Sequence, residues 1–204
     1  MSREILLELF YWPPVSWLAL ARCADILWIE ANEHYQKGSY RHRCYIAGPN
    51  GILRLSVPLR KGKHRQMPIR DVRIAYDTPW QRIQWRTLRS AYGSAPFFEY
   101  YADAVRTFFE KRYVFLFDLN FEILLFLWQA LGGRAEIRLT EHYMTTLEAQ
   151  LRGITDARGC IHRKKQPAVP LISYPQVFED RFGFLSDLSV LDLLFCYGPY
   201  MLRN

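Results

Sequence analysis

The stretch HYQKGSYRHRC, from His34 to Cys44, gathers side chains that could bind a ligand or take part in catalysis. It contains two histidines, two arginines, two tyrosines, a lysine and a cysteine. Arginine and lysine bind phosphate or carboxylate groups, aromatic rings stack on bases, and histidine is the commonest general base. The alternative interpretation is a solvated strand edge, which the spacing by itself favours.

We predict a strand in the second half of this stretch. Alternation along a strand would give it two faces, with Tyr40, His42 and Cys44 on one and Arg41 and Arg43 on the other. Two arginines at this spacing suit a phosphate or carboxylate, and Lys37 would add a third positive charge. A thiol nucleophile at Cys44 with His34 or His42 is a weaker hypothesis, because free cysteines are usually buried.

A second candidate surface lies in residues 80–93, where the pattern predicts a helix. Arg82, Trp85, Arg86 and Arg89 have helical spacing and would share one face. Such a face could bind a phosphorylated ligand with base stacking, or nucleic acid. It could equally be a surface helix whose tryptophan packs on the core.

Asp192 is unusual because it lies inside the apolar run VLDLLF. A carboxylate on a buried helix needs a partner. We consider Arg41, Arg43 or Arg86 as that partner.

Metal and cofactor sites are not predicted. Cys160 and His162 could form half of a zinc site, but the other cysteines and histidines lack the regular spacing of a complete one. The sequence contains no GxGxxG, GxxxxGK[ST], HExxH or GxSxG motif, which disfavours the usual dinucleotide enzymes, P-loop NTPases, zincins and serine hydrolases. We therefore expect no metal and no cofactor.

The elements that must position these residues begin with strand, helix and strand at 5–12, 17–24 and 26–30. This order predicts two parallel strands, and ligands of α/β sheets bind beyond the carboxyl ends of such strands. The stretch from His34 to Cys44 follows the second strand directly. Two strand-like runs then flank Gly48-Pro49-Asn50-Gly51, which predicts a hairpin.

The rest of the chain alternates helices with short strands. We predict a strand over 69–76, helices over 80–93, 96–113 and 119–133 (capped by Asp118), a strand over 135–145, a helix over 145–153 and a helix over 190–197 capped by Ser189. We expect a poorly structured basic loop at about 154–170. The predicted fold is a single α/β domain over 1–204, with a mixed, mostly parallel sheet, an antiparallel hairpin addition and flanking helices.

Composition favours a globular protein with an anionic partner. The chain has 204 residues and a formal net charge of +7, so its field attracts phosphates. Its apolar runs are too short for a membrane span, and the first residues do not form a signal peptide pattern. The four cysteines are scattered, so we expect reduced thiols and a cytoplasmic location.

Several blocks, in order, resemble the WbqC-like protein family. They are YWPPVSWLALARCADILWIE, HYQKGSYRHRC, NGILRLSVPL, IRDVRI, WQRIQWRTLRSAYGSAPFFEYY and LSVLDLLFCYGP, covering most of 5–115 and then 184–199. Within this resemblance, several residues look like the family's strongly recurring positions, among them Tyr35, Lys37, Arg41, Arg43, Asp71, Trp85 and Asp192. Departures occur at Tyr40, His42 and Cys196, and 134–170 resembles the family poorly.

The resemblance implies a role in bacterial surface polysaccharide synthesis, of the O-antigen type. We predict a transferase that acts on a nucleotide-linked or amino sugar, by acyl transfer. Lys37, Arg41 and Arg43 would bind phosphate or carboxylate, and Tyr35 and Arg86 would be further substrate-binding residues. Trp85 or Tyr40 would stack on a base or sugar, and His34 or His42 would be the general base. Asp192 or Asp71 would orient a basic partner. The alternatives are a non-catalytic module that binds nucleic acid or an anionic polymer, or a scaffold protein. The oligomeric state stays open.

Overall fold

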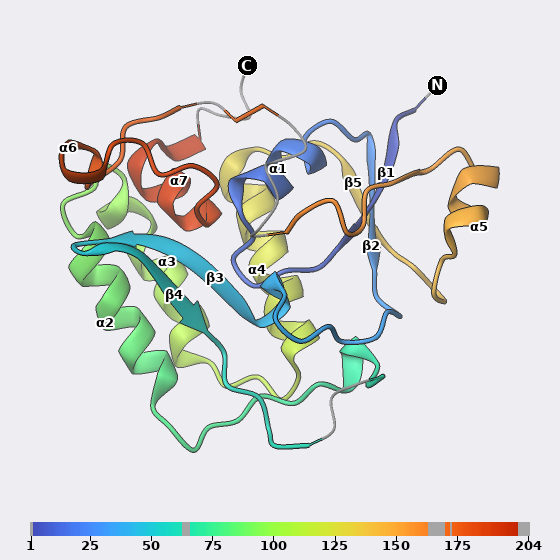
Figure 1. Ribbon diagram of the computed structural model, residues 1–204, viewed down its shortest axis with the longest axis horizontal. Coiled ribbons are helices and arrows are strands. Elements are labelled where there is room, and N and C mark those ends of the chain that lie inside the picture. The colour runs from blue at the N-terminus through green and yellow to red at the C-terminus, as the bar shows by residue number, and fades with distance from the viewer. Residues whose placement is uncertain (1, 63–65, 163–169, 172, 200–204) are drawn as a thin grey trace.

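A parallel sheet forms one end of the molecule. The computed structural model describes residues 2–62, 66–162, 170–171 and 173–199. Four strands, β1 (Glu4–Glu8), β2 (Ile26–Glu30), β5 (Glu136–Leu139) and β6 (Thr155–Asp156), lie in the order β5-β2-β1-β6 and are all parallel (Figure 1). Helix α1 (Val15–Ala21) connects β1 to β2. The predicted strand, helix and parallel strand unit is confirmed.

The central strands end together at one edge of the sheet. Glu8, the last residue of β1, lies opposite Glu30, the last residue of β2. The apolar residues of β1 are buried, as expected for a parallel strand that is covered on both faces. The sheet therefore presents two glutamates side by side at the carboxyl ends of its central strands.

The hairpin forms a sheet of its own. Strands β3 (Arg43–Gly48) and β4 (Gly51–Ser56) pair antiparallel around Pro49 and Asn50, and Gly51 has φ 102°, which suits glycine. The hairpin is confirmed, but it does not join the parallel sheet. The strand predicted over 69–76 is wrong. Its first residues form the 3₁₀ helix η2 (Ile69–Asp71). A 3₁₀ helix has three residues per turn, so Ile69 and Val72 both point into the core, where they are buried.

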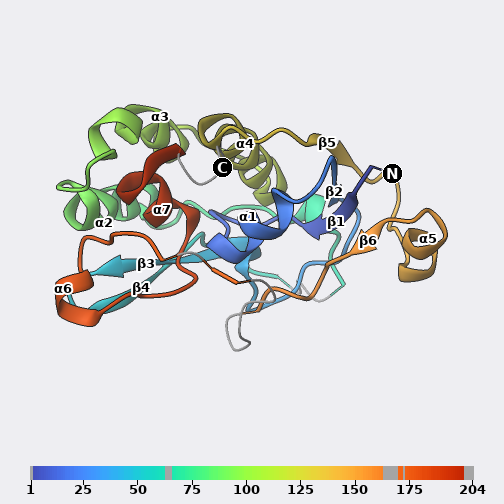
Figure 2. The same ribbon diagram turned by 90° about the horizontal axis from the view of Figure 1, so that it is seen from above.

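Three long helices lie along the upper side of the molecule in Figure 2, with the hairpin below α2 and α3: α2 (Trp80–Tyr92), α3 (Phe98–Glu110) and α4 (Leu116–Leu131). All three were predicted. The cap proposed at Asp118 is wrong, because α4 begins two residues earlier and Asp118 lies in its first turn. Within the ranges given above, no helix is long and apolar enough to cross a bilayer.

The last third of the chain adds α5 (Thr146–Leu151), α6 (Glu179–Phe182) and α7 (Val190–Cys196), and the Ser189 hydroxyl caps α7 as predicted. Near the beginning of the segment predicted as a poorly structured basic loop, β6 pairs with β1. Residues 163–169 of that loop lie outside the described part of the chain. Helix α5 lies beyond the parallel sheet, at the end of the molecule farthest from the hairpin (Figure 1).

Candidate functional site

The arginine face predicted for Arg41 and Arg43 does not form. Residues Tyr40–His42 make the 3₁₀ helix η1, and the strand begins only at Arg43. The Ser39 hydroxyl accepts a hydrogen bond from the Arg41 amide and caps this turn. Because a 3₁₀ helix has three residues per turn, the alternation of a strand does not apply here. The two arginines therefore enter different surroundings.

Arg41 is buried, with 1% of its surface exposed, and holds two carboxylates. Its Nε donates to Glu33 Oε1 at 2.7 Å, and its Nη2 donates to Glu33 Oε2. The same Nη2 lies 3.5 Å from Glu8 Oε1. Burial raises the pKa of Glu33, whereas the hydrogen bond and charge of Arg41 oppose that rise. Arg41 therefore balances the charge of buried carboxylates, and its Nε and Nη2 are not free to bind a ligand together.

Arg43 instead lines a large cavity, which we call the basic cavity. Its volume is about 970 Å³, and its polar lining includes Tyr35, Lys37, His42, Arg43 and Arg54. Arg54 and Ser56 come from β4, and Arg43 pairs with Ser56 across the hairpin. The hairpin thus positions two arginines on one wall of this cavity.

Tyr35, His42 and Arg43 are linked in the basic cavity. Tyr35 Oη lies 2.8 Å from His42 Nδ1, and Arg43 Nη2 lies 3.3 Å from His42 Nε2. Arginine can only donate, so His42 Nε2 accepts in this arrangement, and a neutral imidazole then carries its proton on Nδ1 and donates it to Tyr35. Arg43 Nε is buried and has no hydrogen-bond partner among the described residues. At least one donor of Arg43 is therefore left for a ligand.

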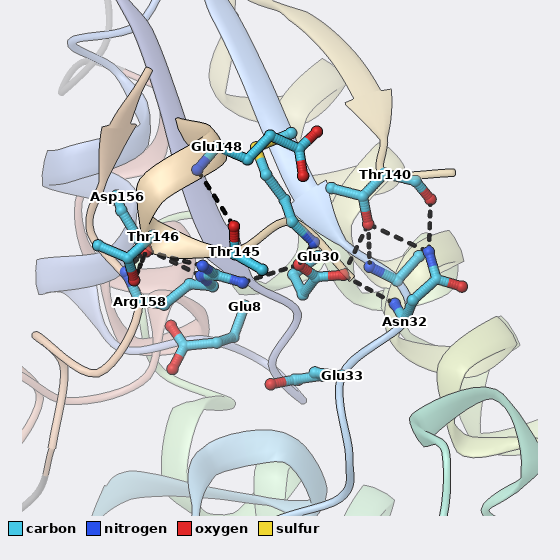
Figure 3. Close-up of polar contacts among 12 residues, drawn as sticks. Glu8, Glu30, Asn32, Glu33, Thr140, Thr145, Thr146, Glu148, Asp156 and Arg158 are labelled. Atoms are coloured by element: carbon cyan, nitrogen blue, oxygen red, sulfur yellow. Dashed lines mark hydrogen bonds and ion pairs between the residues drawn. The ribbon is translucent and has the colours of Figure 1, made fainter. Parts of the chain in front are cut away.

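A second hollow, which we call the acidic cavity, opens where the parallel strands end. It has a volume of about 400 Å³. Its acidic and basic lining residues are Glu8, Glu33, His34, Asp156 and Arg158. Figure 3 shows the carboxylates of Glu8 and Glu33 on the same side of the ion pair between Arg158 and Glu30. This is the position where α/β sheets bind ligands.

Arg158 forms ion pairs with the residues that end β2 and β6, at the acidic cavity. Its Nη1 donates to Glu30 Oε2 at 2.8 Å, and its Nε and Nη2 donate to the two oxygens of Asp156. The hydrogen bond from Arg158 lowers the pKa of Asp156. The other oxygen of Glu30 accepts from the Thr140 hydroxyl at 2.7 Å. Glu30 and Asp156 are therefore satisfied within the protein.

The two cavities adjoin each other. Tyr35 lines both of them. A small crevice of about 60 Å³ is lined by Arg43 from the basic side and by Glu8 and Gly159 from the acidic side. Cationic and carboxylate linings therefore lie on either side of the shared residue Tyr35.

Several residues predicted for the site lie elsewhere. Trp85 stacks on Phe98, with ring centroids 6.1 Å apart, so its face is used in packing. Arg86 is exposed on α2, Asp71 is exposed in η2, and neither is among the residues that line the two cavities. Tyr40 is buried, although it lines the small crevice between the cavities.

Cys44 is fully buried, and burial raises the pKa of its thiol far above the usual range. That state is the opposite of the thiolate that a nucleophile needs. The hypothesis of a Cys44 nucleophile is not supported by this geometry.

Among the described residues Asp192 pairs with two tyrosines and a glutamine, and not with Arg41, Arg43 or Arg86, so the predicted arginine partner is wrong. Its Oδ1 accepts from Tyr92 Oη, and its Oδ2 accepts from Tyr174 Oη and Gln176 Nε2, each at 2.8 Å. Burial raises the pKa of Asp192, and these hydrogen bonds oppose the rise. Asp192 lines neither cavity and fixes α7 against α2 and the 174–176 segment.

Sequence reasoning missed most of the acidic cavity. Glu8, Glu30, Glu33, Asp156 and Arg158 were not among its predicted residues. A signal was present, because EILLE and ILWIE are apolar strands that both end in glutamate. Acidic residues at the ends of two parallel strands meet at one edge. No local sequence pattern predicted Asp156 and Arg158 as site residues, since β6 has only two residues.

Comparisons with known proteins identify the family. No curated protein and no solved structure matches this chain. The sequence model of the WbqC-like protein family matches residues 10–165 of the 204. The match continues through 134–165, where the blocks resembled the family least, and it stops before 184–199. Since it spans more than half of the chain, this protein belongs to the WbqC-like protein family.

Proposed function

We propose that this protein is an enzyme of bacterial surface polysaccharide synthesis, of the O-antigen type, that binds a nucleotide-linked sugar in the basic cavity. The phosphate groups would lie against Arg43, Arg54 and Lys37, and the sugar would extend toward the acidic cavity. Family membership supports the pathway, and the charge and size of the cavity support the ligand. The proposal includes a cytoplasmic location, which the four free cysteines favour.

The observation that carries this proposal is the state of Arg43. Its Nε–H is buried and lacks an acceptor among the residues that the structure describes, which costs about 1–3 kcal/mol unless a ligand supplies one. A phosphate oxygen is the best acceptor for a guanidinium, because the hydrogen bond is charge-assisted. Arg54 and Lys37 line the same space and add two positive charges.

The reaction that we propose is acyl transfer from a thioester to the amine of a sugar. The amine nitrogen forms a bond to the acyl carbon, the carbon–sulfur bond breaks, and the sulfur leaves with the electron pair as a thiolate. The amine proton passes to a histidine, which then protonates the thiolate. His34, which is exposed and lines the acidic cavity, is the base in this proposal, because the acceptor nitrogen of His42 already faces Arg43.

Nucleic-acid binding by α2 has less support. Arg82, Arg86 and Arg89 are exposed on that helix, but Trp85 packs against Phe98 and is not free to stack on a base. Surface arginines alone bind nucleic acid without specificity and with strong dependence on salt.

A binding experiment with two arginine variants tests the proposal. Pyrophosphate and a panel of uridine, guanosine and thymidine diphosphate sugars are titrated into the wild type, Arg43→Ala and Arg86→Ala by calorimetry. We expect at least one of these ligands to bind, and Arg43→Ala to weaken it about 10- to 100-fold, the value of one or two charge-assisted hydrogen bonds. Arg86→Ala removes the same charge outside the cavity and should change affinity less than about twofold. Binding by none of the ligands, or equal losses in both variants, would overturn the proposal.

A further inference from the structure

We propose that the acidic cavity binds the ammonium group of an amino sugar, with Glu8 as its principal partner. The choice of a sugar rests on the proposed function, whereas the ammonium group follows from the carboxylates of this cavity. The site lies at the carboxyl ends of β1, β2 and β6 and is separate from the basic cavity that receives the phosphates.

The first observation is an unpartnered oxygen on Glu8. Only 4% of the Glu8 surface is exposed. Its Oε1 accepts from the Gly159 amide at 2.9 Å and faces Arg41 at 3.5 Å. Its Oε2 is buried and has no hydrogen-bond partner in the described part of the chain. A buried carboxylate oxygen without a donor is costly, so this atom is ready for a ligand that donates.

The second observation is the balance of charge around the cavity. Four carboxylates gather there, on Glu8, Glu30, Glu33 and Asp156, against the two guanidinium groups of Arg41 and Arg158. If all are ionised, four negative charges face two positive ones and leave two in excess. His34, on the same lining, is exposed and could offset only part of that excess.

Both arginines are already engaged. Arg41 donates to Glu33 with Nε and Nη2, and Arg158 donates to Asp156 and Glu30 with all three of its nitrogens. Neither can turn to Glu8 Oε2 without giving up a carboxylate that is itself buried or half-buried. A cation from outside would complete the site at lower cost.

An ammonium group fits these acceptor oxygens and this space better than a metal ion. It offers three N–H donors, and a cavity of about 400 Å³ can receive a single sugar ring. Within the described ranges, no group of three or more His, Cys, Asp and Glu side chains is placed to hold a metal. Tyr35 lines both cavities and Glu8 and Arg43 line one crevice, so in this proposal the amine belongs to the molecule whose phosphates lie at Arg43.

The experiment compares two sugars that differ in one group. Glucosamine carries an ammonium group where glucose has a hydroxyl, and ethanolamine is the minimal ammonium probe. Binding of each to the full chain is measured by calorimetry at neutral pH. The variants are Glu8→Gln, which is nearly isosteric but uncharged, Glu8→Asp, which keeps the charge, and Glu141→Gln as a matched control. Glu141 is exposed near the same edge and lines neither cavity.

We expect glucosamine to bind about tenfold or more tightly than glucose, and Glu8→Gln to remove that difference. Glu141→Gln should leave the affinity within about twofold. If Glu8→Gln fails to fold, Glu8→Asp and the wild type still give the comparison of glucosamine with glucose. Equal binding of the two sugars, or binding of ethanolamine and glucosamine that survives Glu8→Gln, would overturn the inference. So would a Mg²⁺ site that depends on Glu8 and excludes the amines.

The outcome is independent of the proposed function. If anions bind through Arg43 while neither amine binds, only this inference falls. If the amines bind through Glu8 while Arg43→Ala leaves anion binding unchanged, the proposed function falls and the ammonium site stands.

Discussion

Replacing Arg41 by methionine should destabilise the protein in a manner that depends on pH. Arg41 is the guanidinium nearest to both Glu33 and Glu8, and all three side chains are almost fully buried. Methionine would fill much of the space but leave two carboxylates without their cation. Removing one partner from a buried ion pair costs about 3–5 kcal/mol, so we expect a loss of that size at pH 8.

The pH dependence follows from Glu33. Burial already raises its pKa above the ordinary value of 4.5, and Arg41 supplies the hydrogen bond and charge that oppose the rise. In Arg41→Met the folded pKa should rise further while the unfolded pKa stays the same. The folded state then binds a proton more readily than the unfolded chain, so stability is lost as the pH rises from the unfolded to the folded pKa. Each titrating group contributes at most about 1.4 kcal/mol per pH unit in that window.

Urea unfolding followed by circular dichroism, at pH 5, 6, 7 and 8, measures this effect. The loss relative to the wild type should be smallest at pH 5 and should grow toward pH 8. The double variant Arg41→Met/Glu33→Gln should recover part of the loss, because it removes one of the unpaired charges. Arg86→Met, at an exposed arginine, should stay within about 0.5 kcal/mol. A loss that is the same at pH 5 and pH 8, or below about 1 kcal/mol at pH 8, would refute this account of Arg41.

Two further predictions concern the residues that sequence reasoning placed in the site. Asp192→Asn should reduce the free energy of unfolding by about 1–3 kcal/mol, because an amide cannot accept from all three donors of Tyr92, Tyr174 and Gln176. Its nucleotide-sugar affinity, measured by calorimetry, should stay within about twofold, and a tenfold loss with the fold intact would return Asp192 to the site. A thiol assay at pH 8 should detect two reactive cysteines, Cys23 and Cys160, in the folded protein and four after denaturation. Burial raises the pKa of Cys196 to about 12 and that of Cys44 further, so rapid reaction of either in the native state would contradict their burial.

Local pattern predicted the elements that carry strong periodicity. Helices α2 and α3 begin and end within a few residues of the predicted bounds, and the Asn50-Gly51 step marked the hairpin. Position after a parallel strand also led to residues that the structure brings together, because Tyr35, Lys37, His42 and Arg43 line one cavity. These features depend on residues close together in the chain.

The features that were missed depend on residues far apart. Glu8 meets Gly159 across 151 positions, and Glu30 meets Arg158 across 128. Strand β6 consists of two residues that pair with β1, which is too short for a strand pattern in the sequence. Alternation failed at Arg41 because the turn η1 interrupts the strand, and the partner that fixes Arg41, Glu33, lies eight residues earlier.

The most direct measurement is a crystal structure of the protein with the nucleotide-linked sugar that binds most tightly in the panel. We predict that a phosphate oxygen lies about 2.7–2.9 Å from Arg43 Nε, the usual length of a charge-assisted hydrogen bond, with Lys37 or Arg54 beside it. A phosphate bound instead along Arg82, Arg86 and Arg89 of α2, with the basic cavity unchanged, would contradict it.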